Sequence, residues 1–118
     1  MPKLLFVDDE NSWRELCRHE FESMGYEVEV SGSGDQGLQM AITLPPDVIV
    51  VDLCMPTSGR SLLEILKREL PEVPVIVHTA YSGYSGTPGL ARANAVVTKQ
   101  ADLAPLKSQI SKLLAPTA

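Results

Sequence analysis

A run of apolar residues that ends in a single acid constrains the fold of this chain more than any other feature. Residues 48–51 read Val-Ile-Val-Val, Asp52 follows directly, and Pro56 turns the chain away soon after. Consecutive β-branched side chains cannot alternate between a buried and an exposed face, so we expect a strand buried on both faces of a parallel sheet. Open α/β sheets bind their ligands at the carboxyl ends of the strands, which is where this run places Asp52.

Segments typical of strands and of helices alternate along the rest of the chain. Further strands are expected at 3–7, 26–30, 73–78 and 95–98, and helices at 12–24, 35–44, 62–70 and 103–113. Ser12 and Glu15 fit a capping box at the start of the first helix, whereas the glycine-rich segment 82–89 predicts a short or irregular fourth helix. This alternation indicates an α/β, flavodoxin-like doubly wound sheet of parallel strands in the order 2-1-3-4-5.

Length and charge restrict the class of protein further. We expect one domain over residues 1–118, with 115–118 as a frayed tail or the start of a linker. The net charge of -5 disfavours direct contact with nucleic acids or with an anionic membrane. No apolar run approaches the ~20 residues of a membrane span, and no signal peptide is recognisable. Cys17 and Cys54 lie in no metal-binding spacing, as expected of free thiols in a reducing compartment, so we expect a cytoplasmic location.

The expected strand order brings polar residues from several strands to one edge of the sheet. Strands 1 and 3 are neighbours in this order, so Asp8 and Asp9 are expected beside Asp52. Thr79 and Lys99 follow the fourth and fifth strands and reach the same edge. Two carboxylates ~4 Å apart at an effective dielectric constant of ~20 repel each other by about 4 kcal/mol, so the acids need a compensating charge. Mg2+ supplies one, since this ion prefers carboxylates, waters and a phosphate oxygen.

These residue types suit the transfer of a phosphoryl group to an aspartate. An Asp carboxylate is a known covalent acceptor of phosphoryl groups. Lys99 offers a positive charge for phosphate oxygens, and Thr79 offers a hydroxyl donor. Because the transition state of phosphoryl transfer is loose, positioning and charge neutralisation provide most of the catalysis that is needed. We therefore interpret Asp52 as a phosphoacceptor.

The whole chain resembles the receiver domain of two-component response regulators. The resemblance rests on four marks, namely Asp8-Asp9, Asp52 with Met55-Pro56, Thr79-Ala80, and Lys99. It implies phosphorylation of Asp52 by a histidine kinase or a phosphotransfer protein, followed by changed binding to a downstream effector or an attached output domain. It also implies that Thr79 and Lys99 hold the phosphoryl oxygens. The implied chemistry is Mg2+-dependent self-phosphorylation and autodephosphorylation, rather than the turnover of a substrate by an enzyme.

The resemblance further implies a particular set of metal ligands. By the family pattern, Asp9 and Asp52 would bind Mg2+ together with the backbone carbonyl of Cys54. Asp8 would assist through a water molecule. All four positions follow the first or third expected strand, so the ion would lie between the ends of these two strands.

Several features depart from the family pattern. Val96 stands where the family has an aromatic residue, and Gln100 stands where a proline usually follows the lysine. The loop at 55–59 is one residue short, and the segment 82–89 is rich in glycine. The departures at Val96 and Gln100 motivate an alternative function, a phosphorylation-independent receiver-like module that binds proteins. A third class, a phosphatase with Asp52 as its nucleophile, is disfavoured because the chain leaves no room for a cap domain.

Overall fold

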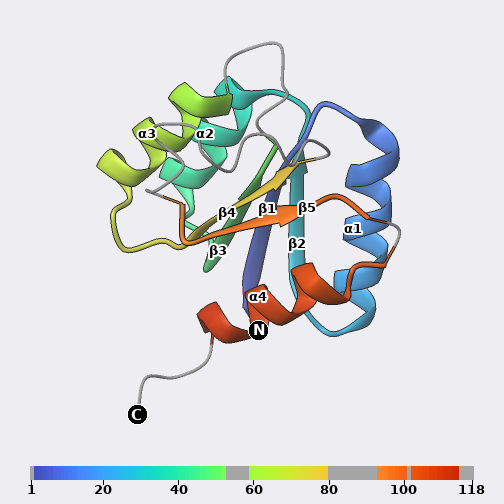
Figure 1. The fold of residues 1–118 in the computed structure, drawn as a ribbon. Coiled ribbons are helices and arrows are strands. Elements are labelled where there is room, and N and C mark those ends of the chain that lie inside the picture. The colour runs from blue at the N-terminus through green and yellow to red at the C-terminus, as the bar shows by residue number, and fades with distance from the viewer. Residues whose placement is uncertain (1, 53–58, 80–92, 101, 115–118) are drawn as a thin grey trace.

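The computed structural model of this chain describes residues 2–52, 59–79, 93–100 and 102–114. Its centre is one parallel sheet of five strands in the order β2-β1-β3-β4-β5 (Figure 1). The strands are β1 (Lys3–Val7), β2 (Glu27–Ser31), β3 (Val48–Val51), β4 (Val75–Thr79) and β5 (Ala95–Thr98). This order confirms the flavodoxin-like topology predicted from the sequence.

The described helices cover both faces of the sheet. They are α1 (Asn11–Ser23), α2 (Gly34–Thr43), α3 (Gly59–Glu69) and α4 (Ala104–Leu114). Figure 1 shows α2 and α3 on one face, with α1 and α4 on the other. The helix predicted to be short or irregular falls within 80–92, outside the described residues. The longest of the four described helices has 13 residues, and none of the four could cross a bilayer.

The central strands are buried on both faces, as the apolar run at 48–51 predicts. All four side chains of β3 and all five of β4 are buried. Toward the α2 and α3 face, Ile49 and Val51 join a core cluster with Leu63 and Leu66 of α3. Toward the α1 and α4 face, alternate residues of the same strands pack with residues that include Phe21, Leu106 and Ile110. The sheet therefore contributes side chains to two apolar cores, one on each of its faces.

The strand register sets which residues meet at the carboxyl edge. Val7 of β1 lies opposite Val51 of β3, so Asp8 and Asp52 leave their strands at the same level. The ladder continues one step further, since the Asp52 amide donates to the Val7 carbonyl at 3.0 Å. On the other side of β4, the Lys99 amide donates to the Thr79 carbonyl at 2.7 Å. These backbone bonds align the end of β1 with that of β3 and the end of β4 with that of β5, and the pairing of β3 with β4 joins the two pairs.

The start of α1 differs from the sequence prediction. The N-cap residue is Glu10, and no side chain caps the helix, so the capping box predicted at Ser12 and Glu15 is wrong. Instead, the Asp8 carboxylate accepts a hydrogen bond from the Glu10 amide at 2.9 Å. Oδ1 of Asp8 thus stabilises the turn after β1, and the helix begins one residue before Ser12.

Candidate functional site

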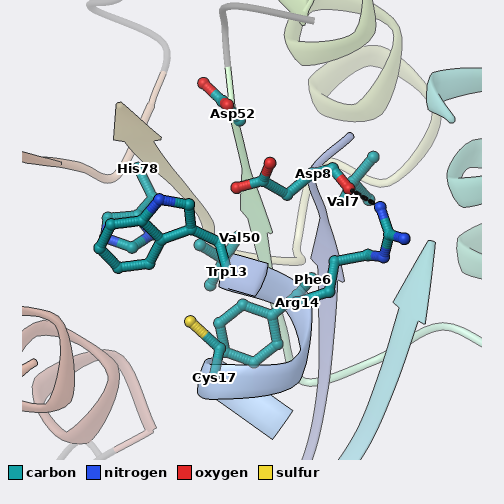
Figure 2. Close-up of a pocket in the computed structure, with 9 residues that line it drawn as sticks. All are labelled: Phe6, Val7, Asp8, Trp13, Arg14, Cys17, Val50, Asp52 and His78. Carbon is teal, nitrogen blue, oxygen red and sulfur yellow. Dashed lines mark hydrogen bonds between the residues drawn. The ribbon is translucent and has the colours of Figure 1, made fainter. Parts of the chain in front are cut away.

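The site is a cluster of acids around a buried lysine at the carboxyl edge of the sheet. The Nζ atom of Lys99 lies 2.7 Å from Oδ2 of Asp8 and 2.9 Å from Oδ2 of Asp52. The Lys99 side chain is 1% exposed and the Asp52 side chain is 2% exposed. Figure 2 shows Asp8 and Asp52 at the ends of β1 and β3. The structure therefore brings together three of the residues predicted for the site.

A third carboxylate, from Glu10, completes the cluster. Its Oε1 atom lies 3.4 Å from Nζ of Lys99. Asp8, Glu10 and Asp52 each offer one oxygen, and these three atoms lie within 4.8 Å of one another. Among the described residues this is the one group of acids suited to a metal ion. Sequence reasoning missed Glu10, whose only signal was its place in the acidic run after β1.

The other residues predicted for the site do not belong to this cluster of acids around Lys99, or lie outside the described residues. Asp9 is exposed and falls outside the group of three carboxylates, so its role as a metal ligand stays a prediction. Thr79 is buried at the end of β4, where its carbonyl accepts the Lys99 amide. The Cys54 carbonyl and the segment 82–89 lie outside the described residues.

Burial and hydrogen bonding shift the pKa values of Asp8 and Lys99 in opposite directions. Burial raises the pKa of Asp8, although the hydrogen bond from Lys99 works against this shift. Burial works to lower the pKa of Lys99, but its hydrogen bonds with Asp8 and Asp52 outweigh that effect and raise it. Lys99 therefore remains an ammonium ion at neutral pH. The compensating charge that the crowded acids require is supplied, at least in part, by this side chain.

A hydrogen-bonded arginine fixes the turn that presents Asp8. Nη1 of Arg14 donates to the backbone carbonyl of Asp8 at 2.7 Å, drawn as the dashed line in Figure 2. Nη2 of the same side chain donates to Oδ1 of Asn11 at 3.2 Å. Gly32 makes room for the guanidinium, because a Cβ atom there would lie 2.9 Å from Nη1. The turn between β1 and α1 is thereby held against the loop after β2.

Beneath the carboxylates lies a small cavity, which Asp8, Arg14 and Asp52 line together with uncharged side chains. Its volume is about 10 Å³, its other lining residues include Trp13, Cys17 and His78, and it holds no more than about one water molecule. Burial lowers the pKa of His78 to about 4, so its imidazole is neutral at pH 7. Burial raises the pKa of Cys17 to about 12, so its thiol stays protonated. Neither His78 nor Cys17 therefore adds a charge to this edge at pH 7.

The fold and the edge together define an α/β protein that presents a buried aspartate, a buried lysine and further acids at the ends of adjacent parallel strands. Residues 4–111 match the family model of the response regulator receiver domain. The chain therefore belongs to the response regulator receiver domain family, and it is a receiver domain of the two-component type. The resemblance inferred from the sequence is confirmed.

Individual relatives agree with this assignment. The chain is 32% identical over 83 residues to the DNA-binding dual master transcriptional regulator RpaA of Synechocystis, a match that covers 68% of this chain and 34% of that protein. It is 34% identical over 79 residues to the alkaline phosphatase synthesis transcriptional regulatory protein PhoP of Bacillus subtilis, covering 66% of this chain and 33% of PhoP. The chain thus spans about a third of the length of these curated relatives.

A solved structure resembles the fold over nearly the whole chain. The response regulator TrrA of Thermotoga maritima, in complex with Mg(2+)-BeF, has a TM-score of 0.93 and 30% sequence identity. The match covers 97% of this chain and 100% of that one. TrrA has also been solved in complex with the histidine kinase ThkA, where the TM-score is 0.91.

Proposed function

We propose that Asp52 accepts a phosphoryl group from a histidine kinase or a phosphotransfer protein. The observation that carries this proposal is the Lys99 ammonium, held 2.9 Å from the Asp52 carboxylate at the end of β3. In the reaction, a carboxylate oxygen of Asp52 forms a bond to phosphorus while the phosphorus–nitrogen bond of a phosphohistidine breaks. The released imidazole keeps the electron pair and takes up a proton. Lys99 stays protonated throughout and neutralises the charge on the phosphoryl oxygens.

The donor set of the cluster fits Mg2+. This ion prefers carboxylate oxygens and retains several waters, and the cluster offers one oxygen from each of three acids within 4.8 Å. Asp8, Glu10 and Asp52 would hold the ion, with Asp9 and the Cys54 carbonyl as the further ligands that the family pattern implies. When bound, Mg2+ supplies positive charge to the phosphoryl oxygens. The complex of TrrA with Mg(2+)-BeF supports this assignment by analogy.

The partners of this chain follow from the same reaction. A histidine kinase is supported by the ThkA complex of the relative TrrA. Phosphorylation would change binding to a protein effector or to an attached output domain. Since RpaA is a DNA-binding regulator and about three times longer than the stretch matched here, nucleic-acid contact is assigned to such an output domain and not to this receiver. A cytoplasmic location, with one domain over 1–118, remains part of the proposal.

Intact mass spectrometry tests the phosphoacceptor directly. The chain is incubated with acetyl phosphate and Mg2+, beside the variant Asp52→Asn and a sample with EDTA. We expect one phosphoryl group on the wild-type chain and none on the variant or with EDTA. An unmodified wild-type chain, under conditions where Mg2+ is shown to bind, would overturn the proposal.

One observation favours the alternative of a phosphorylation-independent module. Val96 of β5 occupies the position of the family's aromatic residue, and this residue is 44% exposed. A surface valine lacks the ring whose rotation would report the phosphorylated state. The two functions are separated by measuring the affinity of a partner protein, isolated by its binding to the wild-type chain, for wild type and for Asp52→Asn. Equal affinity of both, with and without beryllium fluoride, would support the module and count against the switch.

A further inference from the structure

The Lys99 ammonium is surrounded by more than carboxylates. Its Nζ atom also lies 5.3 Å from the ring centroid of Trp13, which belongs to the first turn of α1. This distance is within the range of a cation–π contact, in which the face of an indole attracts a positive charge. Trp13 and Lys99 are 86 positions apart in the sequence, and the contact joins α1 to the end of the edge strand β5.

The indole is itself held in place by the sheet. The rings of Trp13 and His78 meet edge to face, with centroids 5.6 Å apart and planes at 84° (Figure 2). His78 belongs to β4 and is buried, directly before Thr79. An edge-to-face pair of this kind favours the observed orientation of both rings. The contact with His78 therefore holds the indole of Trp13 beside the long side chain of Lys99.

We propose that Trp13 is a positioning residue that directs the Lys99 ammonium toward Asp8 and Asp52 during phosphoryl transfer. The inference rests on the proposed function and deepens it. The groups that hold Lys99 change during the reaction. The Asp52 carboxylate becomes an acyl phosphate, and its negative charge is replaced by that of the phosphoryl oxygens. The attraction of an indole face does not depend on that exchange, so Trp13 keeps the ammonium in place before and after it.

A comparison of variants on one helix tests this role. Trp13→Phe keeps an aromatic face, whereas Trp13→Leu keeps only apolar volume. Phe21→Leu is the matched control, since Phe21 is a buried aromatic residue of α1 that packs with Phe6 and Tyr26. Rates of modification by acetyl phosphate are measured by intact mass, and the free energy of unfolding is measured for each variant.

The expected result is a split between the two leucine variants. Trp13→Leu should be modified about fivefold more slowly than wild type, the size of one cation–π contact. Trp13→Phe should recover most of that rate, and Phe21→Leu should react like wild type despite its lower stability. Equal rates for Trp13→Leu and wild type would overturn the positioning role while leaving the phosphoacceptor intact. Equal slowing of both leucine variants would also overturn it. A wild-type chain that takes up no phosphoryl group would overturn both proposals.

Fluorescence supplies a readout that needs no reaction and no variant of Trp13. The chain has one tryptophan, so its emission reports this residue alone. Lys99→Met should shift the emission of Trp13 because a charge beside the indole is removed. Lys107→Met is the control, since Lys107 pairs with Glu20 at 3.2 Å and lines the groove between α1 and α4. Identical spectra for Lys99→Met and wild type would contradict a contact between the two side chains.

Discussion

Lys99 and Asp8 form an ion pair, but the charge of Lys99 stabilises the folded chain, whereas burial makes the charge of Asp8 costly. The ammonium of Lys99 faces three carboxylates, two of them buried, so its removal takes a shared positive charge away from those acids. Removing one partner of a buried ion pair commonly costs about 3–5 kcal/mol. Burial raises the pKa of Asp8, so the ionised form of this acid is held at an energetic cost in the folded state. The lysine is therefore the residue on which the cluster depends.

The buried imidazole of His78 predicts a loss of stability in mild acid. Its pKa is lowered to about 4 in the folded chain, whereas the unfolded chain has the ordinary value near 6.5. Between these values the unfolded state binds a proton that the folded state does not, so the free energy of unfolding falls as the pH falls. This group alone should remove about 2 kcal/mol between pH 7 and pH 5.

Urea denaturation at the two pH values measures this effect, with the second histidine of the chain as a control. His78→Gln should lose less stability than wild type on going from pH 7 to pH 5. His19→Gln should behave like wild type, because His19 is exposed on α1. A wild-type dependence retained in His78→Gln would show that His78 does not cause it.

Single substitutions can also decide whether Asp9 or Glu10 is a ligand of the metal ion. The structure groups Glu10 with Asp8 and Asp52, whereas the family pattern predicts Asp9. If the structural group holds Mg2+, Glu10→Gln should weaken binding about tenfold, as loss of a metal-site group commonly does, and Asp9→Asn should change it less. Titration with Mg2+, followed by Trp13 fluorescence or calorimetry, measures both affinities. The opposite ranking would favour the family pattern and place Glu10 outside the coordination sphere.

At the scale of single elements, α2 is packed tightly against the end of β1. A Cβ atom at Gly37 would lie 2.7 Å from Cγ2 of Val7, the residue before Asp8. Gly37→Ala should therefore destabilise the fold by about 1–2 kcal/mol, because overpacking outweighs the gain in helix propensity. Chemical denaturation measures the change.

A double variant separates this clash from other effects of the alanine. Val7→Ala makes the room that the new methyl group needs. It should therefore cost less in the Gly37→Ala background than in wild type. Strictly additive costs would mean that α2 shifts away from β1 without contacting Val7.

The elements were largely predictable from the sequence, but the contacts between them were not. The buried run at 48–51 and the alternation of strands and helices are local patterns, and they led to the observed strand order. The first residues of α1 were mispredicted because Asp8 takes the Glu10 amide, a choice set by the backbone of the turn. The place of Glu10 in the cluster follows from the same turn. Contact of Trp13 with Lys99 joins segments far apart in sequence, for which no local pattern exists.

At the scale of the whole molecule, the sheet links its two apolar cores. Ile49 and Val51 face one core, and Val48 and Val50 of the same strand face the other. Loss of either helical layer exposes one face of β3, so the two layers should unfold together. In EDTA, urea transitions followed by Trp13 fluorescence and by far-UV circular dichroism should coincide. Separate midpoints would show that the α2 and α3 layer unfolds independently of the α1 and α4 layer.

The positions of the first strand and of the last described helix have a practical consequence for measurement. Figure 1 shows that β1 begins, and α4 ends, on the side of the molecule away from the carboxyl edge that holds Asp52. A fluorescent protein or a surface anchor attached before β1 or after α4 would start from that side, so we expect the edge to stay open to a phosphodonor. Immobilisation on a biosensor chip in this way would allow docking of a candidate histidine kinase to be tested on one oriented layer, with and without beryllium fluoride.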